Sequence, residues 1–335
     1  MDPVTQGVLG ASAALIVAKN RKKLKHAAFV GAAAGMAPDL DILLQSSQDP
    51  LFALELHRQF THSLVFIPFG GLIVAAFFWL LFYRKQPFSP IFWYATAGYA
   101  THGLIDSCTS YGTQLFWPFT DYRVAWDLIG IIDFFVTIPL LIGIIFTCVT
   151  KTKTGVGAAV GFFMAYMGFG AVQHQRALQT VEEQVIQGSF EVDRIKAMPT
   201  IGNLIVWRTL HEAGGRYYVN AVAVPIFGES RVYPGPTVQK LNMERDFPEI
   251  KQDSVQFNDV NRFRWFTNNW LVVDPQHSDR IADLRYSAQV EGINPLWSIR
   301  LDPTKQHQHV KYLSGLSEGD RDIIPFNKIF DSSSD

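Results

Sequence analysis

Apolar residues are concentrated in the first half of the chain. Long apolar runs dominate up to about Gln173, whereas charged residues, Pro, Asn and Gln recur every few positions from His174 onward. Three runs, residues 63–82, 128–149 and 155–173, come close to the roughly 20 residues that a helix needs to cross about 30 Å of hydrocarbon. The pattern predicts a membrane domain over residues 1–173 and a soluble domain over residues 174–335.

Three further apolar segments are shorter. Residues 91–107 carry His102 and Asp106 near their end, and residues 4–18 and 26–37 are rich in Gly and Ala, with Gly31 and Gly35 four positions apart. Small residues at this spacing favour close packing of membrane helices. We therefore predict about six hydrophobic helices. The alternative for the two shortest segments is an Ala-rich hairpin that is buried or crosses the membrane only partly.

The second half of the chain predicts a helix and several strands. A helix is expected over residues 173–186, before four segments rich in β-branched and aromatic residues: NLIVWRTL, RYYVNAVAVPIF, FRWFTNNWLVV and IADLRYSAQV. Such segments are typical of a mostly antiparallel sheet. The predicted fold class is an α-helical polytopic membrane domain followed by a soluble, mostly β (α+β) domain, with a short disordered tail, SSSD.

Basic residues are unevenly distributed among the short connections between the apolar segments. Three alternate connections contain nine of them: Lys19, Arg21, Lys22, Lys23, Lys25, Arg84, Lys85, Lys151 and Lys153. The connections at residues 38–62 and 108–127 contain only Arg58 and Arg123. Because positive loops stay in the cytoplasm, we predict a multi-pass protein of the cytoplasmic (inner) membrane with its C-terminal domain extracytoplasmic.

The overall charge excludes one class of partner. The formal net charge is -1, whereas binding a nucleic-acid backbone needs a clustered Lys and Arg surface. We therefore expect membrane lipid, and no nucleic acid, as a partner.

Candidate metal ligands gather in the connections on the predicted outer side. In the first cluster, Pro38 disfavours helix, and an extended Asp39-Leu40-Asp41 would direct both carboxylates to the same side. The alternative is a solvated turn. In the second cluster, HRQFTHS, residues five apart lie about 140° apart on a helix. His57 and His62 can therefore reach one ion only if His57 lies in a loop or in the turn before the helix; otherwise they are two interfacial histidines.

The third cluster, THGLIDS, has the most specific spacing. His102 and Asp106 are four positions apart and share one face of a helix, the spacing by which helices present two ligands to one metal ion. Ionisable groups inside a membrane segment are costly and are usually functional. Asp127 follows in a loop, and Asp133 could orient a ligand histidine or pair with another buried polar group.

The ligand chemistry narrows the choice of metal. Mixed imidazole and carboxylate ligands suit Zn, Mn or Fe, and the number of carboxylates leaves room for one or two ions. The sequence contains no HExxH motif and no P-loop. We therefore expect a divalent metal ion, Zn or Mn, as the cofactor.

Several motifs in the same order resemble a known family. The segments MDPVTQGVLGA, GMAPDLD, HRQFTHS, THGLIDSCTSYGTQLFWPF and DYRVAWDLIGIIDFFVTIPLL are similar to the membrane-bound metal-dependent hydrolases, also described as LexA-binding, inner-membrane-associated hydrolases. The resemblance covers roughly residues 1–150. It implies six metal-site residues: Asp39, Asp41, His57, His62, His102 and Asp106. Asp127 would be a neighbour, and many members have histidine where this chain has Gln6.

These observations predict a membrane-embedded metal-dependent hydrolase. Arg58 or Arg123 could pair with an anionic substrate group, which favours phosphoester or lipid-linked substrates. We therefore assign catalytic roles to Arg58 and Asp127. One alternative is a non-enzymatic membrane scaffold or regulator with a structural metal site. A transporter is disfavoured because paired halves with interrupted helices are not evident.

Overall fold

The computed structural model describes residues 1–187 and 192–315. The chain forms two compact units. The first comprises residues 1–45, 55–174 and 198–204, and the second comprises residues 46–54, 175–197 and those from 205 onward. Each unit therefore contains a short segment that a single boundary after residue 173 would assign to the other. The predicted SSSD tail lies outside the described residues.

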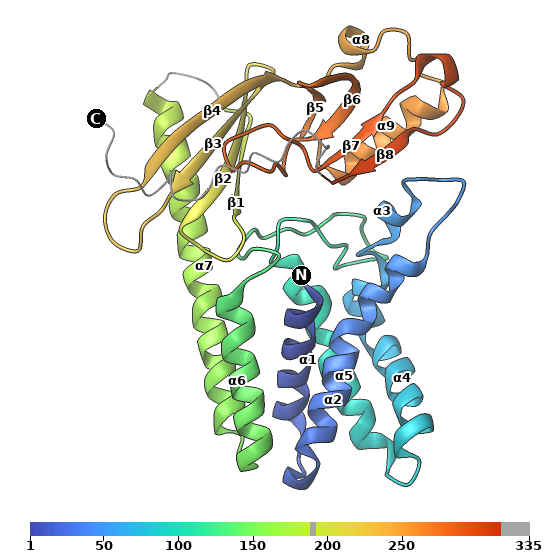
Figure 1. Ribbon diagram of the computed structural model, residues 1–335, viewed down its shortest axis with the longest axis vertical. Coiled ribbons are helices and arrows are strands. Elements are labelled where there is room, and N and C mark those ends of the chain that lie inside the picture. The colour runs from blue at the N-terminus through green and yellow to red at the C-terminus, as the bar shows by residue number, and fades with distance from the viewer. Residues whose placement is uncertain (188–191, 316–335) are drawn as a thin grey trace. The chain divides into compact units, whose positions relative to one another are not determined.

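The first unit is helical (Figure 1). Its longer helices are α1 (Pro3–Val17), α2 (Leu24–Met36), α4 (Ile67–Phe78), α5 (Phe88–Ser107), α6 (Phe134–Thr150) and the first part of α7 (Thr154–Gln187). Its short elements are the 3₁₀ helices η1 (Arg21–Lys23), η2 (Ala37–Leu43), η3 (Phe60–His62) and η4 (Leu64–Phe66), and the π-helix η5 (Trp79–Tyr83). Helices α1, α2 and α4 pack against α5 around buried residues such as Leu15, Leu24 and Tyr99.

Helices α1 and α2 approach each other very closely. A Cβ atom on Gly31 would lie 2.3 Å from Ala14 Cβ, and one on Gly35 would lie 2.5 Å from the Gln6 carbonyl oxygen. Only glycine leaves room for such a backbone approach. The close packing predicted from the spacing of Gly31 and Gly35 is confirmed.

Two helices among the described residues are long and apolar enough to cross a membrane, rather than about six. They are Leu64–Tyr83 and Thr154–Ile186, while α1 and α6 are apolar but shorter. The predicted segment 128–149 is shortened because Asp133 caps α6, accepting a hydrogen bond from the Phe135 backbone N at 2.9 Å. The helix predicted over residues 173–186 is the continuation of α7 rather than a separate element.

The second unit contains two four-stranded sheets (Figure 1). One has the order β1 (Arg194–Pro199), β2 (Val206–Ala213), β3 (Arg216–Ala223) and β4 (Arg231–Gln239); the other has the order β5 (Leu271–Asp274), β6 (His277–Asp283), β7 (Trp297–Arg300) and β8 (Lys311–Ser314). The pairs from β2 to β4 and from β5 to β8 are antiparallel. The short helices are α8 (Met243–Asp246), α9 (Val255–Phe266) and the 3₁₀ helix η6 (Pro303–Lys305), and the unit boundary falls within α3 (Phe52–Leu56). A helical region followed by a β-rich region confirms the α+β description.

One predicted strand is partly helical. The residues FRWF of the segment FRWFTNNWLVV form the end of α9, and strand β5 begins only at Leu271. Ser254 caps this helix by accepting a hydrogen bond from the Phe257 backbone N at 3.2 Å. Val260, Phe263 and Phe266 are buried at helical spacing, and this 3.6-residue period outweighs the strand preference of the aromatic residues.

Candidate metal centre

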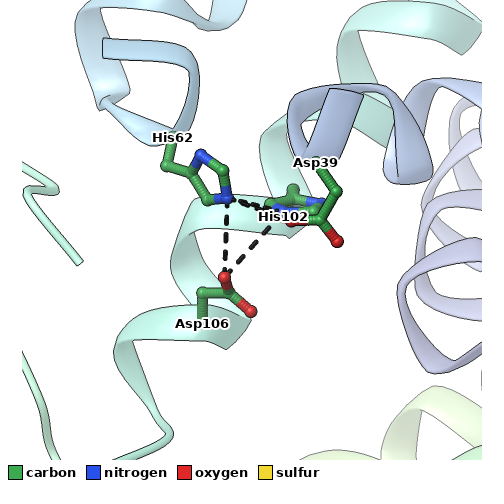
Figure 2. A group of neighbouring side chains, drawn as sticks. All are labelled: Asp39, His62, His102 and Asp106. Atoms are coloured by element: carbon green, nitrogen blue, oxygen red, sulfur yellow. Dashed lines mark hydrogen bonds and ion pairs between the residues drawn. The ribbon is translucent and has the colours of Figure 1, made fainter. Parts of the chain in front are cut away.

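Four side chains of the first unit converge on one point. Asp39 in η2, His62 in η3, and His102 and Asp106 in α5 each offer one ligand atom, and these four atoms lie within 4.8 Å of one another. Figure 2 shows the two imidazoles and the Asp106 carboxylate turned toward one another, with Asp39 beside His102. His62, His102 and Asp106 are buried, whereas Asp39 is partly exposed. The site is therefore enclosed, with limited access on the Asp39 side.

The distances within this cluster suit a small divalent ion. The Nε2 atoms of His62 and His102 are 2.9 Å apart, and Asp39 Oδ1 lies 3.4 Å and 3.2 Å from them. Asp106 Oδ2 lies 3.6 Å from His62 Nε2 and 3.8 Å from His102 Nε2. Four tetrahedral ligands at about 2.1 Å from a metal ion would be separated by about 3.4 Å. The observed separations scatter around that value.

The proton of His102 is directed away from the cluster. Its Nδ1 lies 2.6 Å from the Gly35 carbonyl oxygen. A carbonyl oxygen can only accept, so Nδ1 carries the hydrogen. In the neutral ring, Nε2 then presents a lone pair to the other three ligand atoms.

The hydrogen bonds of Thr61 show that His62, like His102, carries its hydrogen on Nδ1. The Thr61 hydroxyl donates its hydrogen to Asp41 Oδ2 at 2.7 Å, and Thr61 Oγ1 also lies 2.9 Å from His62 Nδ1. A hydroxyl has one hydrogen, so Thr61 must accept from His62. Nδ1 of His62 is therefore protonated, and Nε2 of the neutral ring is a second lone pair facing the centre.

With both rings neutral, the converging atoms are thus four acceptors with no donor among them. Asp106 Oδ2 is buried and has no hydrogen-bond partner; the Arg58 Nε atom 3.0 Å away forms an ion pair without hydrogen-bond geometry. Facing lone pairs and carboxylates repel one another unless a cation lies between them. The donor set, two imidazoles and two carboxylates, fits Zn²⁺ or Mn²⁺.

The pKa shifts outside the membrane helices indicate the same preference for positive charge. Burial disfavours the ionised form of Asp39, but the imidazoles of His102 and His62, which can donate to it when a proton occupies Nε2, outweigh burial and hold the pKa of Asp39 well below its ordinary value. Burial likewise disfavours a charged His62, yet hydrogen bonds with Asp39 and Asp41 raise its pKa. The field that favours a proton at this point also favours a metal ion.

Asp41 and His57 lie on the other edge of the His62 ring. Asp41 accepts from the His57 Nδ1 atom at 2.7 Å and lies 3.4 Å from His62 Nδ1, so Asp41, His57 and His62 form a second group of possible ligands. His57 lies in a turn before η3, where a convergent arrangement requires it.

The extended Asp-x-Asp conformation predicted for residues 39–41 is wrong. Residues 37–43 form a 3₁₀ helix with three residues per turn, so the two aspartates leave the backbone about 120° apart. This angle explains why Asp39 reaches Nε2 of His62 while Asp41 reaches Nδ1. By its contacts, Asp41 holds His62 in place from outside the four-atom cluster.

Arg58 joins the two aspartate groups. Its backbone N donates to Asp41 Oδ2 at 3.3 Å, its side chain pairs with Asp106, and its guanidinium carbon lies 4.4 Å above the Tyr111 ring centroid. The guanidinium of Arg123 lies 5.7 Å from the same ring. Arg58 is buried and has a φ of 68°, a conformation that costs on the order of 1 kcal/mol and is often found at functional sites.

Asp127 is near the centre along the backbone but is not one of the four convergent residues. It is buried with a φ of 56°. Its neighbours Trp126 and Leu128 donate backbone hydrogen bonds to the carbonyls of Ser107 and Cys108, both at 2.8 Å. These bonds hold Asp127 beside the end of α5, close to the helical turn that carries Asp106.

The remaining contacts around the centre involve Asp133, the Gln6 position that the resemblance singled out, and Gly103, which was not foreseen. Asp133 is the cap of α6 and accepts from the Tyr166 hydroxyl at 2.8 Å, so of the two roles considered for it, its contacts match pairing with another polar group and not orientation of a ligand histidine. Gln6 donates to Asp106 Oδ1 at 2.7 Å, while its own Oε1 is buried without a partner. A Cβ atom on Gly103 would lie 2.0 Å from the His62 carbonyl oxygen. These contacts join distant parts of the chain and leave no local pattern in the sequence.

The comparisons with known proteins concern mainly this helical region. The family model described as YdjM inner membrane protein matches residues 1–177, more than half of the chain. The chain is also 32% identical over 122 residues to "Uncharacterized protein YfhP" of Bacillus subtilis (strain 168). That similarity covers 36% of this chain and 37% of the relative, so it spans little more than a third of the relative's length. No solved structure matches the chain.

Proposed function

We propose that this chain, which belongs to the YdjM inner membrane protein family, is a membrane-embedded metal-dependent hydrolase. It would act at the outer face of the cytoplasmic membrane on phosphoester or lipid-linked substrates. Family membership and two membrane-length apolar helices support a membrane location. The nine basic residues in alternate connections support a multi-pass topology with the second unit outside.

A single observation carries the proposal. The Nε2 atoms of His62 and His102 and one oxygen each of Asp39 and Asp106 face one point, with the ring protons directed away from it. Such a set would hold Zn²⁺ or Mn²⁺. A divalent ion bound there would lower the pKa of water and polarise the bond to be hydrolysed.

The surrounding residues would orient the two histidines and bind the substrate. Thr61 and Asp41 keep the proton of His62 on Nδ1, and the Gly35 carbonyl does the same for His102. Arg58 would bind an anionic group of the substrate, because its guanidinium is always charged and matches phosphate or carboxylate oxygens. Its position against Asp106 would bring that group beside the reacting water.

Metal analysis with a substrate screen tests the proposal. The parent chain, His62→Ala, His102→Ala and the double variant would be purified in nanodiscs, with His309→Ala of the second unit as the control. We expect the single variants to lose both metal and hydrolysis of phosphoester or lipid-linked substrates, with little further loss in the double variant. Arg58→Ala should keep the metal but turn over substrate at least tenfold more slowly.

Two outcomes would count against this function. Full metal occupancy in both single variants would contradict the assignment of the site. Metal binding by the parent without hydrolysis of any phosphoester, acyl-ester or lipid-linked substrate would instead favour a membrane scaffold or regulator with a structural metal ion.

A further inference from the structure

The 3₁₀ helix that supplies Asp39 and Asp41 exposes apolar side chains on its outer side. Asp41 is only 4% exposed, whereas Leu43 is 73% exposed and Leu40, Ile42 and Leu44 are also exposed. In a segment facing water, the carboxylates would be outside and the leucines inside. The distribution here is reversed.

A second segment beside the centre also exposes large apolar side chains while it buries several polar ones. Between residues 109 and 127, the polar side chains of Thr113, Gln114 and Asp127 are buried. Phe119 is 83% exposed, and the other exposed apolar or amphipathic residues are Phe116, Tyr122 and Trp126. Contiguous exposed apolar groups are typical of an interaction surface rather than a solvated one.

Both segments lie at the end of a membrane-length helix. His62, which is two residues before the apolar helix Leu64–Tyr83, has its Nε2 atom 3.4 Å from Asp39 Oδ1 in η2. The Leu64 backbone N donates to the Leu115 carbonyl at 3.0 Å, which ties the second segment to the first residue of that helix. Both segments therefore lie where this helix would leave the hydrocarbon.

We infer that these two segments form an apolar collar that inserts into the interfacial layer of the lipid bilayer beside the metal centre. The collar consists of Leu40, Ile42, Leu43, Leu44, Phe116, Phe119, Tyr122 and Trp126. Tyr and Trp are favoured at the membrane interface because one end of the side chain is apolar and the other polar. The exposed carboxylate of Asp121 in the same segment places the collar at headgroup level rather than deep among the acyl chains.

The collar also narrows the class of substrate, a step that rests on the proposed function. A centre surrounded by lipid-inserted side chains receives molecules from the membrane more readily than from water. Its substrate would be an amphiphile whose polar, anionic headgroup reaches Arg58 and the four ligands while its chains stay in the bilayer. A water-soluble ester with the same headgroup would be used poorly, because it would lack the local concentration that the membrane provides.

Site-directed spin labelling can test the collar independently of catalysis. Cys108 and Cys148 would be replaced by Ser, and the full chain would carry one nitroxide at Leu43→Cys or Phe119→Cys in nanodiscs of phosphatidylethanolamine and phosphatidylglycerol. Ile73→Cys, exposed within Leu64–Tyr83, provides the lipid reference, and Lys22→Cys, exposed in η1, provides the water reference. Oxygen collides preferentially with labels in lipid, and a neutral nickel chelate with labels in water.

We expect labels at positions 43 and 119 to be at least threefold more accessible to oxygen relative to nickel than the label at position 22, approaching the value at position 73. Nickel accessibility equal to that at position 22 would contradict membrane insertion. Low accessibility to both reagents would also contradict it, because the collar would then be covered by protein. Since these readings need neither metal nor turnover, a failed hydrolase assay and a failed collar are distinguishable.

Discussion

Histidine and aspartate meet around a buried carboxylate in two clusters among the described residues, one in each unit, and the clusters have opposite hydrogen-bonding character. In the second unit, fully buried Asp259 accepts from Arg262 Nη1 at 3.0 Å, His309 Nδ1 at 2.9 Å and the Val310 backbone N at 3.0 Å. Each of these three contacts pairs a donor with an acceptor. In the first unit, the four convergent atoms are all acceptors, and the donors of the two histidines are used elsewhere.

This difference in donors and acceptors shows that residue type alone does not distinguish a structural cluster from a metal centre. A carboxylate surrounded by donors is satisfied by the protein itself. Four acceptors facing one another are satisfied only by something positive placed between them, a metal ion or a proton. His309 thus donates to a carboxylate that the protein itself satisfies, whereas His62 and His102 have the geometry of ligands.

The largest effect that would sharpen this comparison is expected in the second unit. Asp259→Ala leaves Arg262 and His309 without their shared acceptor, and we expect a loss of about 3 kcal/mol in the free energy of unfolding. For a unit of this size that corresponds to a fall of roughly 10 °C in the melting temperature. Differential scanning calorimetry in nanodiscs would measure it. Metal content should stay at the parent level, and a parallel loss of metal would break the distinction between the two clusters.

A smaller effect is expected where α5 approaches η3. Gly103→Ala would place a methyl group against the His62 carbonyl oxygen, and displacing a ligand by this contact should weaken metal binding by roughly 10- to 100-fold. Gly157→Ala is the matched control, since no atom lies within 4 Å of a Cβ at that position. Competition with a chelator would give both affinities. Equal affinities in the two variants would argue that His62 is not a ligand.

The smallest effect is expected from the hydroxyl that orients His62. Thr61→Val keeps the shape but removes the acceptor for the His62 Nδ1 hydrogen and the donor to Asp41. We expect about a tenfold loss of metal affinity, and Thr61→Ser should restore it. If serine failed to restore binding, packing rather than proton placement would explain the effect.

The parts of the centre that could be predicted from the sequence depend on regular geometry. His102 and Asp106 are four positions apart on α5, and the helix alone brings them to one face. The relation between Asp39 and Asp41 could not be predicted correctly, because the 3₁₀ turn of η2 replaces the extended conformation that Pro38 favoured. The bond from His102 to Gly35, which orients the ring, links residues 67 positions apart.

The fold was predictable to a similar extent. The change from apolar to mixed composition correctly separated a helical region from a β-rich one. The number of membrane-crossing helices was not predicted correctly. A cap can start a helix later than the apolar run from which the helix was predicted. Asp133, for example, starts α6 several residues after the apolar run begins. Membership in an inner membrane family supports membrane association and leaves the number of crossings as a prediction.

X-ray absorption spectroscopy of the zinc-loaded full chain would test the central claim most directly, because it reports the atoms that surround the ion. We predict a first shell of nitrogen and oxygen at about 2.0–2.1 Å without sulfur, and outer-shell scattering from two imidazole rings. His102→Ala should reduce the imidazole contribution to one ring or abolish binding. A spectrum without imidazole scattering in the parent chain, or one unchanged by His102→Ala, would contradict the proposed centre.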